Sequence, residues 1–155
     1  MSMKKKPLQI LAILHWSMAM PMVVFGGITY YVNWTAPVGA LEESNQLLLY
    51  TPAAVLLVAF PASGMLYSRM IGMVGRDDQL PSKLARFQTA HIIRMASFEA
   101  AGLLGGVMSL ITATSYNLII IAVALGMFIL NQPSAEKVST ALKLDSKETG
   151  QLKGA

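Results

Sequence analysis

The chain has 155 residues, of which 54% are apolar and 13% charged, and its mean hydropathy is +0.53. Because soluble domains carry roughly 25% charged residues, this composition excludes an ordinary water-soluble domain and indicates a protein that lies in a lipid bilayer. The formal net charge of +4 does not indicate nucleic-acid binding, since the basic residues flank apolar segments, and the lack of cysteine excludes disulfides, thiolate metal ligands and cysteine nucleophiles.

Four apolar segments follow one another along the chain, and each is a predicted membrane-spanning helix. They cover about residues 8–32, 46–68, 84–112 and 116–130. A helix that crosses the hydrocarbon core needs about 20 residues. The first three segments are long enough, whereas the fourth, with 15 residues, needs neighbouring helices or a thin bilayer. The first segment is too long for the apolar part of a signal peptide, so we expect it to remain as an anchor.

The chain after the fourth segment is more polar. Pro133 ends the predicted span, and Ser134 is a suitable N-cap for a short amphipathic helix. The residues beyond that helix have little apolar content and are predicted to be mobile. The sequence therefore divides into a transmembrane domain, residues 1–132, and a short cytoplasmic amphipathic helix with a mobile tail, residues 133–155.

Lysine and arginine fall on one side of the four segments. All twelve precede the first segment, lie between the second and the core of the third, or follow the fourth, whereas the opposite connections carry only Glu42 and Glu43. Basic residues in short loops stay on the cytoplasmic face during insertion. The sequence therefore predicts an all-α, four-helix transmembrane bundle in the bacterial inner membrane, a multi-pass protein with both termini in the cytoplasm.

Glu99 is the acidic residue that the pattern places inside a span. An ionisable side chain there costs ~2.5–3.5 kcal/mol on insertion scales and is a functional hypothesis by default. At 100° per residue, Glu99 lies within about 60° of Gly102 and Gly106, so we expect it to face protein or trapped water rather than lipid. Two interpretations stay open: a protonatable carboxylate that transfers protons or cations, or a hydrogen bond that fixes helix packing.

Two histidines and one arginine accompany this carboxylate. His15 lies in the first span at a depth comparable to Glu99, and His91 and Arg94 precede Glu99 on the third. Neutral His15 is suited to a hydrogen bond with Glu99 or with a backbone carbonyl. Arg94 is suited to snorkel to the cytoplasmic interface, with an ion pair or anion binding as the alternatives. We take Glu99, His15, His91 and Arg94 as the candidate proton, ion or polar intramembrane site.

Cofactor and enzyme chemistry have little support in the pattern. Histidines on two different spans raise the hypothesis of a haem held by His15 and His91, but no other feature supports it, and we expect neither a cofactor nor a metal site. Phosphate loops, nucleophile elbows and zinc signatures are all missing. We therefore do not expect a hydrolytic or nucleotide-driven enzyme.

Glycines within the spans mark the predicted helix contacts. Small residues let membrane helices approach closely, and the candidate packing positions are Gly26, Gly102, Gly106 and Gly126. We expect the core contact to form between the small faces of the first and third spans.

Two stretches carry a resemblance to known proteins. They are residues 98–102, with the sequence FEAAG, and residues 131–137, with the sequence NQPSAEK. Within residues 92–144 the chain resembles a group of small, mostly uncharacterised bacterial four-span integral membrane proteins, some of which are labelled as transporters. The resemblance implies a four-span fold and assigns no role to any single residue.

These features favour a small polytopic membrane protein with an intramembrane polar site that serves proton-coupled or small-solute transport. The alternative is a non-catalytic accessory or scaffold subunit of a membrane complex or homo-oligomer, in which Glu99 and the glycine groove bind another membrane protein. A minor alternative is an electron carrier with a bis-histidine haem. The expected partners are the lipid bilayer and either copies of the chain or other membrane subunits, with no nucleic acid.

Overall fold

The computed structural model describes residues 7–35 and 46–153, and every regular element in those ranges is a helix. The helices are α1 (Pro7–Thr35), α2 (Gln46–Gly72), α3 (Leu80–Ile111), α4 (Leu118–Leu130), α5 (Ala135–Leu142) and α6 (Ser146–Lys153). The all-α prediction is thus confirmed. The outer connection with Glu42 and Glu43 lies outside the described residues.

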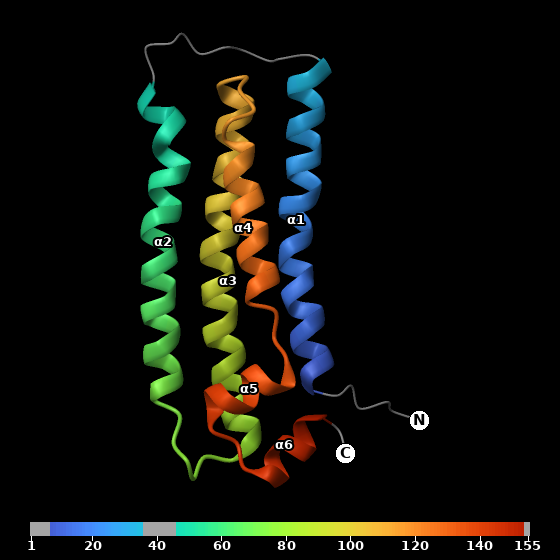
Figure 1. The fold of residues 1–155 in the computed structure, drawn as a ribbon, viewed down its shortest axis with the longest axis vertical. Coiled ribbons are helices and arrows are strands. Elements are labelled where there is room, and N and C mark those ends of the chain that lie inside the picture. Colours follow the sequence, from blue (N-terminus) through green and yellow to red (C-terminus); the bar gives the residue numbers. More distant parts are fainter. Residues whose placement is uncertain (1–6, 36–45, 154–155) are drawn as a thin grey trace.

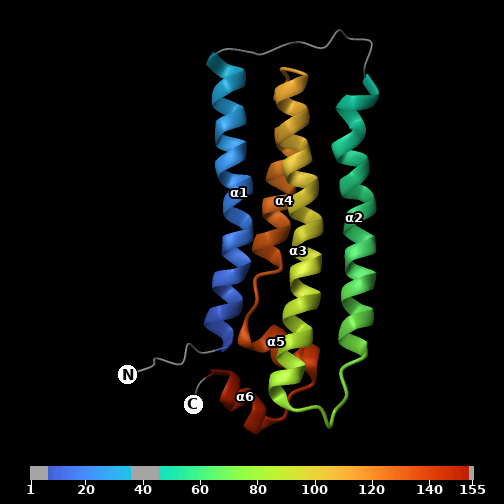
Figure 2. The same cartoon turned by 180° about the vertical axis from the view of Figure 1, so that it is seen from behind.

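Helix α3 is the centre of the bundle. It packs against α1, α2 and α4, while α1 and α2 lie on opposite sides of it (Figures 1 and 2). The short helices α5 and α6 lie together at one end, beside the start of α1 and the connection between α2 and α3 (Figure 1). The first and last described residues, Pro7 and Lys153, therefore lie at the same end of the bundle.

Three helices, α1, α2 and α3, are long and apolar enough to cross a membrane. Helix α4 has 13 residues, and at 1.5 Å per residue it covers only about 20 Å of a ~30 Å hydrocarbon core. It forms a fourth candidate span only together with α5, from which it is bent by 75°. The predicted fourth span is therefore shorter than a membrane crossing and continues into a broken helix.

The main apolar core lies between α1, α3 and α4. It contains Met22, Met95, Phe98, Ala124 and Phe128, all fully buried. Helix α2 contributes little to it and instead turns large apolar side chains outward, among them Leu57, Val58 and Met65. A helix that is apolar on all sides is typical of a membrane span, so the outward face of α2 suits contact with lipid.

Glycines on α3 set how closely its neighbours approach. A Cβ atom on Gly102 would lie 2.6 Å from Sδ of Met22, and one on Gly106 would lie 2.6 Å from a ring carbon of Phe25. Gly105, between them, would place a Cβ 2.9 Å from the backbone oxygen of Asn117. The two α3 glycines predicted to pack, and Gly105 with them, thus lie where α1 and α4 contact α3.

The other two predicted packing glycines differ from these. A Cβ on Gly26 would lie 3.4 Å from side-chain carbons of Ile121, an ordinary van der Waals distance, and a Cβ on Gly126 would meet nothing within 4 Å. The prediction for Gly126 therefore needs correction. Helix α4 turns Ala124 into the core, and a residue two positions later lies about 200° around the helix, so Gly126 faces away from the described helices.

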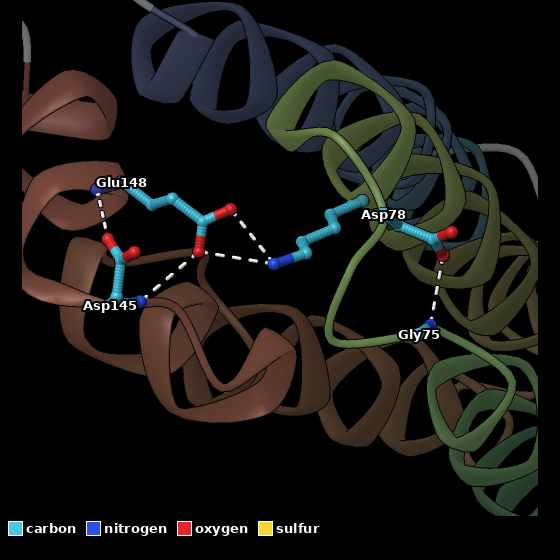
Figure 3. A network of polar contacts seen from close by, with 5 residues as sticks. Gly75, Asp78, Asp145 and Glu148 are labelled. Carbon is cyan, nitrogen blue, oxygen red and sulfur yellow. Dashed lines mark hydrogen bonds and ion pairs between the residues drawn. The ribbon is translucent and has the colours of Figure 1, made fainter.

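The tail is ordered as a second short helix, where the sequence predicted mobility. Asp145 and Glu148 form reciprocal caps at the start of α6: Oδ1 of Asp145 accepts from the Glu148 amide at 2.7 Å, and Oε2 of Glu148 accepts from the Asp145 amide at 3.1 Å (Figure 3). Nζ of Lys83, 3% exposed, donates to Oε1 of Glu148 at 2.8 Å. Leu152 is fully buried. Leu152 and the ion pair between Lys83 and Glu148 thus help to hold α6 against the bundle.

The connection between α2 and α3 is closed by a similar local bond. The amide of Gly75 donates to Oδ2 of Asp78 at 2.9 Å (Figure 3), and Nη1 of Arg86 donates to the carbonyl of Met73 at 3.0 Å. The first bond satisfies an amide of the connection, and the second satisfies a carbonyl just after the end of α2.

The close approach of α4 to α3 at Gly105 is testable. Alanine normally stabilises a helix relative to glycine by up to ~1 kcal/mol, but here its Cβ would meet a rigid backbone oxygen, and we expect Gly105→Ala to destabilise the protein by about 1–3 kcal/mol. Thermal unfolding in detergent, followed by circular dichroism, measures this. Gly64→Ala is the matched control, since its Cβ meets nothing within 4 Å, and equal stability of the two variants would contradict the packing.

Candidate functional site

His15 of α1 and His91 of α3 form a buried polar contact inside the bundle. Nδ1 of His15 lies 3.0 Å from Nε2 of His91, and the residues are 0% and 4% exposed. A neutral imidazole has one donor and one acceptor nitrogen, so one ring donates and the other accepts. We call these two residues the histidine pair.

Aromatic side chains surround the histidine pair. The ring of Phe128 lies 5.2 Å from that of His15, and Phe87 stacks on His91 at 5.8 Å with an interplanar angle of 8°. Trp16 meets His15 edge-on at 5.4 Å. Because these walls offer almost no hydrogen-bonding groups, each imidazole satisfies one nitrogen through the other.

The outer nitrogens of the histidine pair make no hydrogen bond to the described residues, and of the two only Nε2 of His15 is a fully buried, unpaired atom. Nε2 of His15 is buried near the backbone of Phe128, but no hydrogen bond of normal geometry joins it to a described residue. Nδ1 of His91 likewise has no partner among the described residues. The pair is therefore a short polar path with a free nitrogen at each end.

A cavity of about 550 Å³ adjoins His91 at the end of the bundle where α5 lies, and we call it the Arg94 pocket. It lies between α2, α3, the end of α4, and α5. Its main polar and charged lining residues are Tyr67, His91, Arg94, Asn131, Glu136 and Lys137. His15 does not line it, so His91 is the member of the pair that links the buried contact to the pocket.

Arg94 does not extend freely toward the interface. Its guanidinium lies over the ring of Tyr67, with Cζ 5.2 Å from the ring centroid, an arrangement that attracts a cation to the aromatic face. Its Nε atom is buried and has no hydrogen-bond partner among the described residues. Arg94 therefore lines a cavity. It forms no ion pair with a carboxylate of the described residues.

Glu99 is separate from the histidine pair and the pocket. It lies about 12 Å beyond His91 along α3 and 80° around the helix, and it is half-buried. No described residue hydrogen-bonds to it or pairs with it. Of the two partners considered for His15, Glu99 or a backbone carbonyl, the structure shows no bond to Glu99, because α3 turns His91 rather than Glu99 toward His15.

The histidine pair does not have the geometry of a haem site in this structure. Two axial nitrogens on opposite sides of an iron would be about 4 Å apart, given metal–nitrogen distances of ~2.0–2.1 Å. At 3.0 Å the two rings are in direct contact, which leaves no room for a macrocycle between them. Among the described residues, no three His, Asp or Glu side chains cluster as metal ligands.

The pocket itself was not predicted from the sequence. Lys137, Glu136 and Asn131 become lining residues because the chain turns after α4 and brings α5 against α3. The break at residues 131–134 was visible in the sequence, but the direction of the turn depends on packing against distant residues. Neither the family models nor the curated proteins nor the solved structures compared with this chain match it.

A double-mutant cycle tests the coupling within the histidine pair. His15→Leu or His91→Leu alone leaves the other imidazole unpaired in apolar surroundings, and we expect each to cost about 1–3 kcal/mol of stability. The double variant leaves no unpaired ring, so its loss is expected to fall short of the sum by about 0.5–3 kcal/mol. Unfolding in mixed detergent, followed by circular dichroism, gives these values, and strict additivity would contradict the contact.

Proposed function

We propose that this chain is a small multi-span membrane protein that moves protons together with a small solute. The histidine pair holds and passes the proton, and the Arg94 pocket holds the solute. The observation that carries this proposal is the 3.0 Å contact between two buried imidazoles, one of which lines a polar cavity. Ionisable side chains inside a membrane bundle are costly and commonly mark proton and solute paths.

The chemistry of histidine supports this role. It is the side chain whose ordinary titration lies nearest to neutral pH. A proton that enters from the pocket binds Nδ1 of His91, and the proton on Nε2 of His91 passes to Nδ1 of His15. The positive charge thereby moves from His91 to His15. After the proton has entered, the number of protons on the pair does not change.

The proposal places the Arg94 pocket on the cytoplasmic side of the bacterial inner membrane. Three of the twelve basic residues precede Pro7, outside the described residues. The other nine lie on α2, α3, α5, α6 and the α2–α3 and α5–α6 connections, toward the end where α5 and α6 lie (Figure 1). Basic residues near span ends favour the cytoplasmic face. Both termini then lie in the cytoplasm.

Proton movement in proteoliposomes tests the proposal. Vesicles that contain a pH-sensitive dye are given phosphate, succinate, glycine or ethylamine outside, and the wild type is expected to acidify or alkalinise the lumen with at least one of them. We expect His91→Gln, which keeps a hydrogen-bonding side chain but cannot take up a proton near neutral pH, to fall to the rate of protein-free vesicles.

The control is Thr89→Ala, at an exposed position on the same helix, which should move protons at the wild-type rate. The proposal fails if no solute in the panel moves protons with the wild type. It fails equally if His91→Gln retains the wild-type rate.

A second candidate function rests on Glu99. This half-buried carboxylate has no partner among the described residues. It lies within α3, and its exposed part would face lipid unless another helix covers it. A carboxylate so placed is stabilised when another membrane helix donates a hydrogen bond to it. This supports an accessory or scaffold role, in which Glu99 contacts a second copy of the chain or another membrane subunit.

Two variants of Glu99 separate the candidate functions. In a scaffold, Glu99→Leu removes the hydrogen bond and should shift the protein to a smaller assembly, whereas Glu99→Gln should retain the assembly in part. Light scattering after size exclusion in detergent measures the mass. If both variants keep the wild-type mass and co-purifying proteins, Glu99 is not an interface residue.

A further inference from the structure

The Arg94 pocket carries an excess of positive charge. Arg94 of α3 and Lys137 of α5 line it, and the one carboxylate in the lining is that of Glu136. Neither basic side chain has a carboxylate oxygen within 4 Å among the described residues. The lining therefore holds a formal charge of +1 that no group of the described chain neutralises.

Hydrogen-bond donors in this pocket also lack acceptors. Nε of Arg94 is buried without a partner, while Tyr67 holds the guanidinium plane from one side. A desolvated donor of this kind is unfavourable until an acceptor reaches it. A planar guanidinium presents its donors in a fork that suits two oxygen atoms of one anion.

Lys137 of α5 and its neighbour Ser134 add donors to the same pocket. Nζ of Lys137 donates to the carbonyls of Leu130, at 2.8 Å, and Gln132, at 3.3 Å, which leaves one of its three protons free. Oγ of Ser134 accepts from the Lys137 amide at 3.2 Å, so its hydroxyl proton is also free to donate. These two carbonyls, at the end of α4 and just beyond it, thus fix the ammonium in place without neutralising it.

We propose that the Arg94 pocket binds a phosphate-bearing anion between Arg94 on α3, Lys137 on α5 and Ser134, the N-cap of α5. Donors that come from two different helices suit a tetrahedral group with oxygens on several sides better than a flat carboxylate. The volume of about 550 Å³ lies in the usual range for small-molecule sites and accommodates more than a single phosphate. This inference rests on the proposed solute site and specifies its substrate class.

The phosphate group has two sources, a soluble phosphate compound and the headgroup of an anionic lipid. Both present the same oxygens to Arg94, and the experiment separates them. Delipidated protein in detergent is titrated with inorganic phosphate by calorimetry, against chloride at equal ionic strength. In parallel, native mass spectrometry measures binding of phosphatidylglycerol, with phosphatidylcholine as the comparison lipid.

We expect the wild type to bind phosphate, or to retain phosphatidylglycerol in preference to phosphatidylcholine. Arg94→Gln should weaken that binding at least about tenfold, because a charge-assisted hydrogen bond is lost, and Lys137→Gln should weaken it as well. Arg76→Gln is the matched control, since Arg76 is exposed at the same end of the bundle and does not line the pocket. It should bind as the wild type does.

Binding of neither probe by the wild type overturns the inference, and so does equal binding by the wild type and Arg94→Gln. Calorimetric binding of phosphate alone identifies a soluble ligand, and retention of phosphatidylglycerol alone identifies a lipid headgroup. If the anion binds through Arg94 but the vesicles show no proton movement, the anion site stands and the transport proposal fails. If protons move with glycine or ethylamine alone and no phosphate group binds, the substrate class is wrong and transport stands.

Discussion

Two buried imidazoles that satisfy each other across α1 and α3 are the interaction on which the functional part of this bundle depends. Inside a membrane protein water does not satisfy polar groups, so each one needs a partner within the protein. The 3.0 Å contact between His15 and His91 provides that partner. It also sets the rotation of α3. With His91 turned toward α1, Arg94 lies against Tyr67 of α2, and Glu99 lies about 80° around the helix from His91.

The four residues that the sequence grouped into one polar site consequently fall in two separate polar centres. The histidine pair and the Arg94 pocket form a continuous polar region that ends where α5 closes the bundle. Glu99 lies farther along α3 without a partner among the described residues. The first centre suits a solute and a proton, and the second suits another membrane helix, so the two candidate functions do not compete for the same residues.

The sequence predicted the elements well and the contacts between them poorly. Apolar length alone located α1, α2 and α3, and small residues on α3 marked Gly102 and Gly106 as close contacts. The contact between His15 and His91 depends on how α1 and α3 are rotated relative to each other. The pattern of residues around one helix does not determine that rotation. Helix α6 was missed because its stabilising partners, the pocket for Leu152 and the ammonium of Lys83, belong to distant parts of the chain.

The central claim is that His15 and His91 share a hydrogen bond within the membrane. Solid-state NMR of protein labelled with ¹⁵N-histidine and ¹³C-glutamate in lipid bilayers measures this contact directly. The structure predicts a correlation between Nδ1 of His15 and Nε2 of His91 that corresponds to a separation near 3.0 Å. The absence of that correlation, or a correlation of His15 with the carboxyl carbon of Glu99 in its place, would contradict the account.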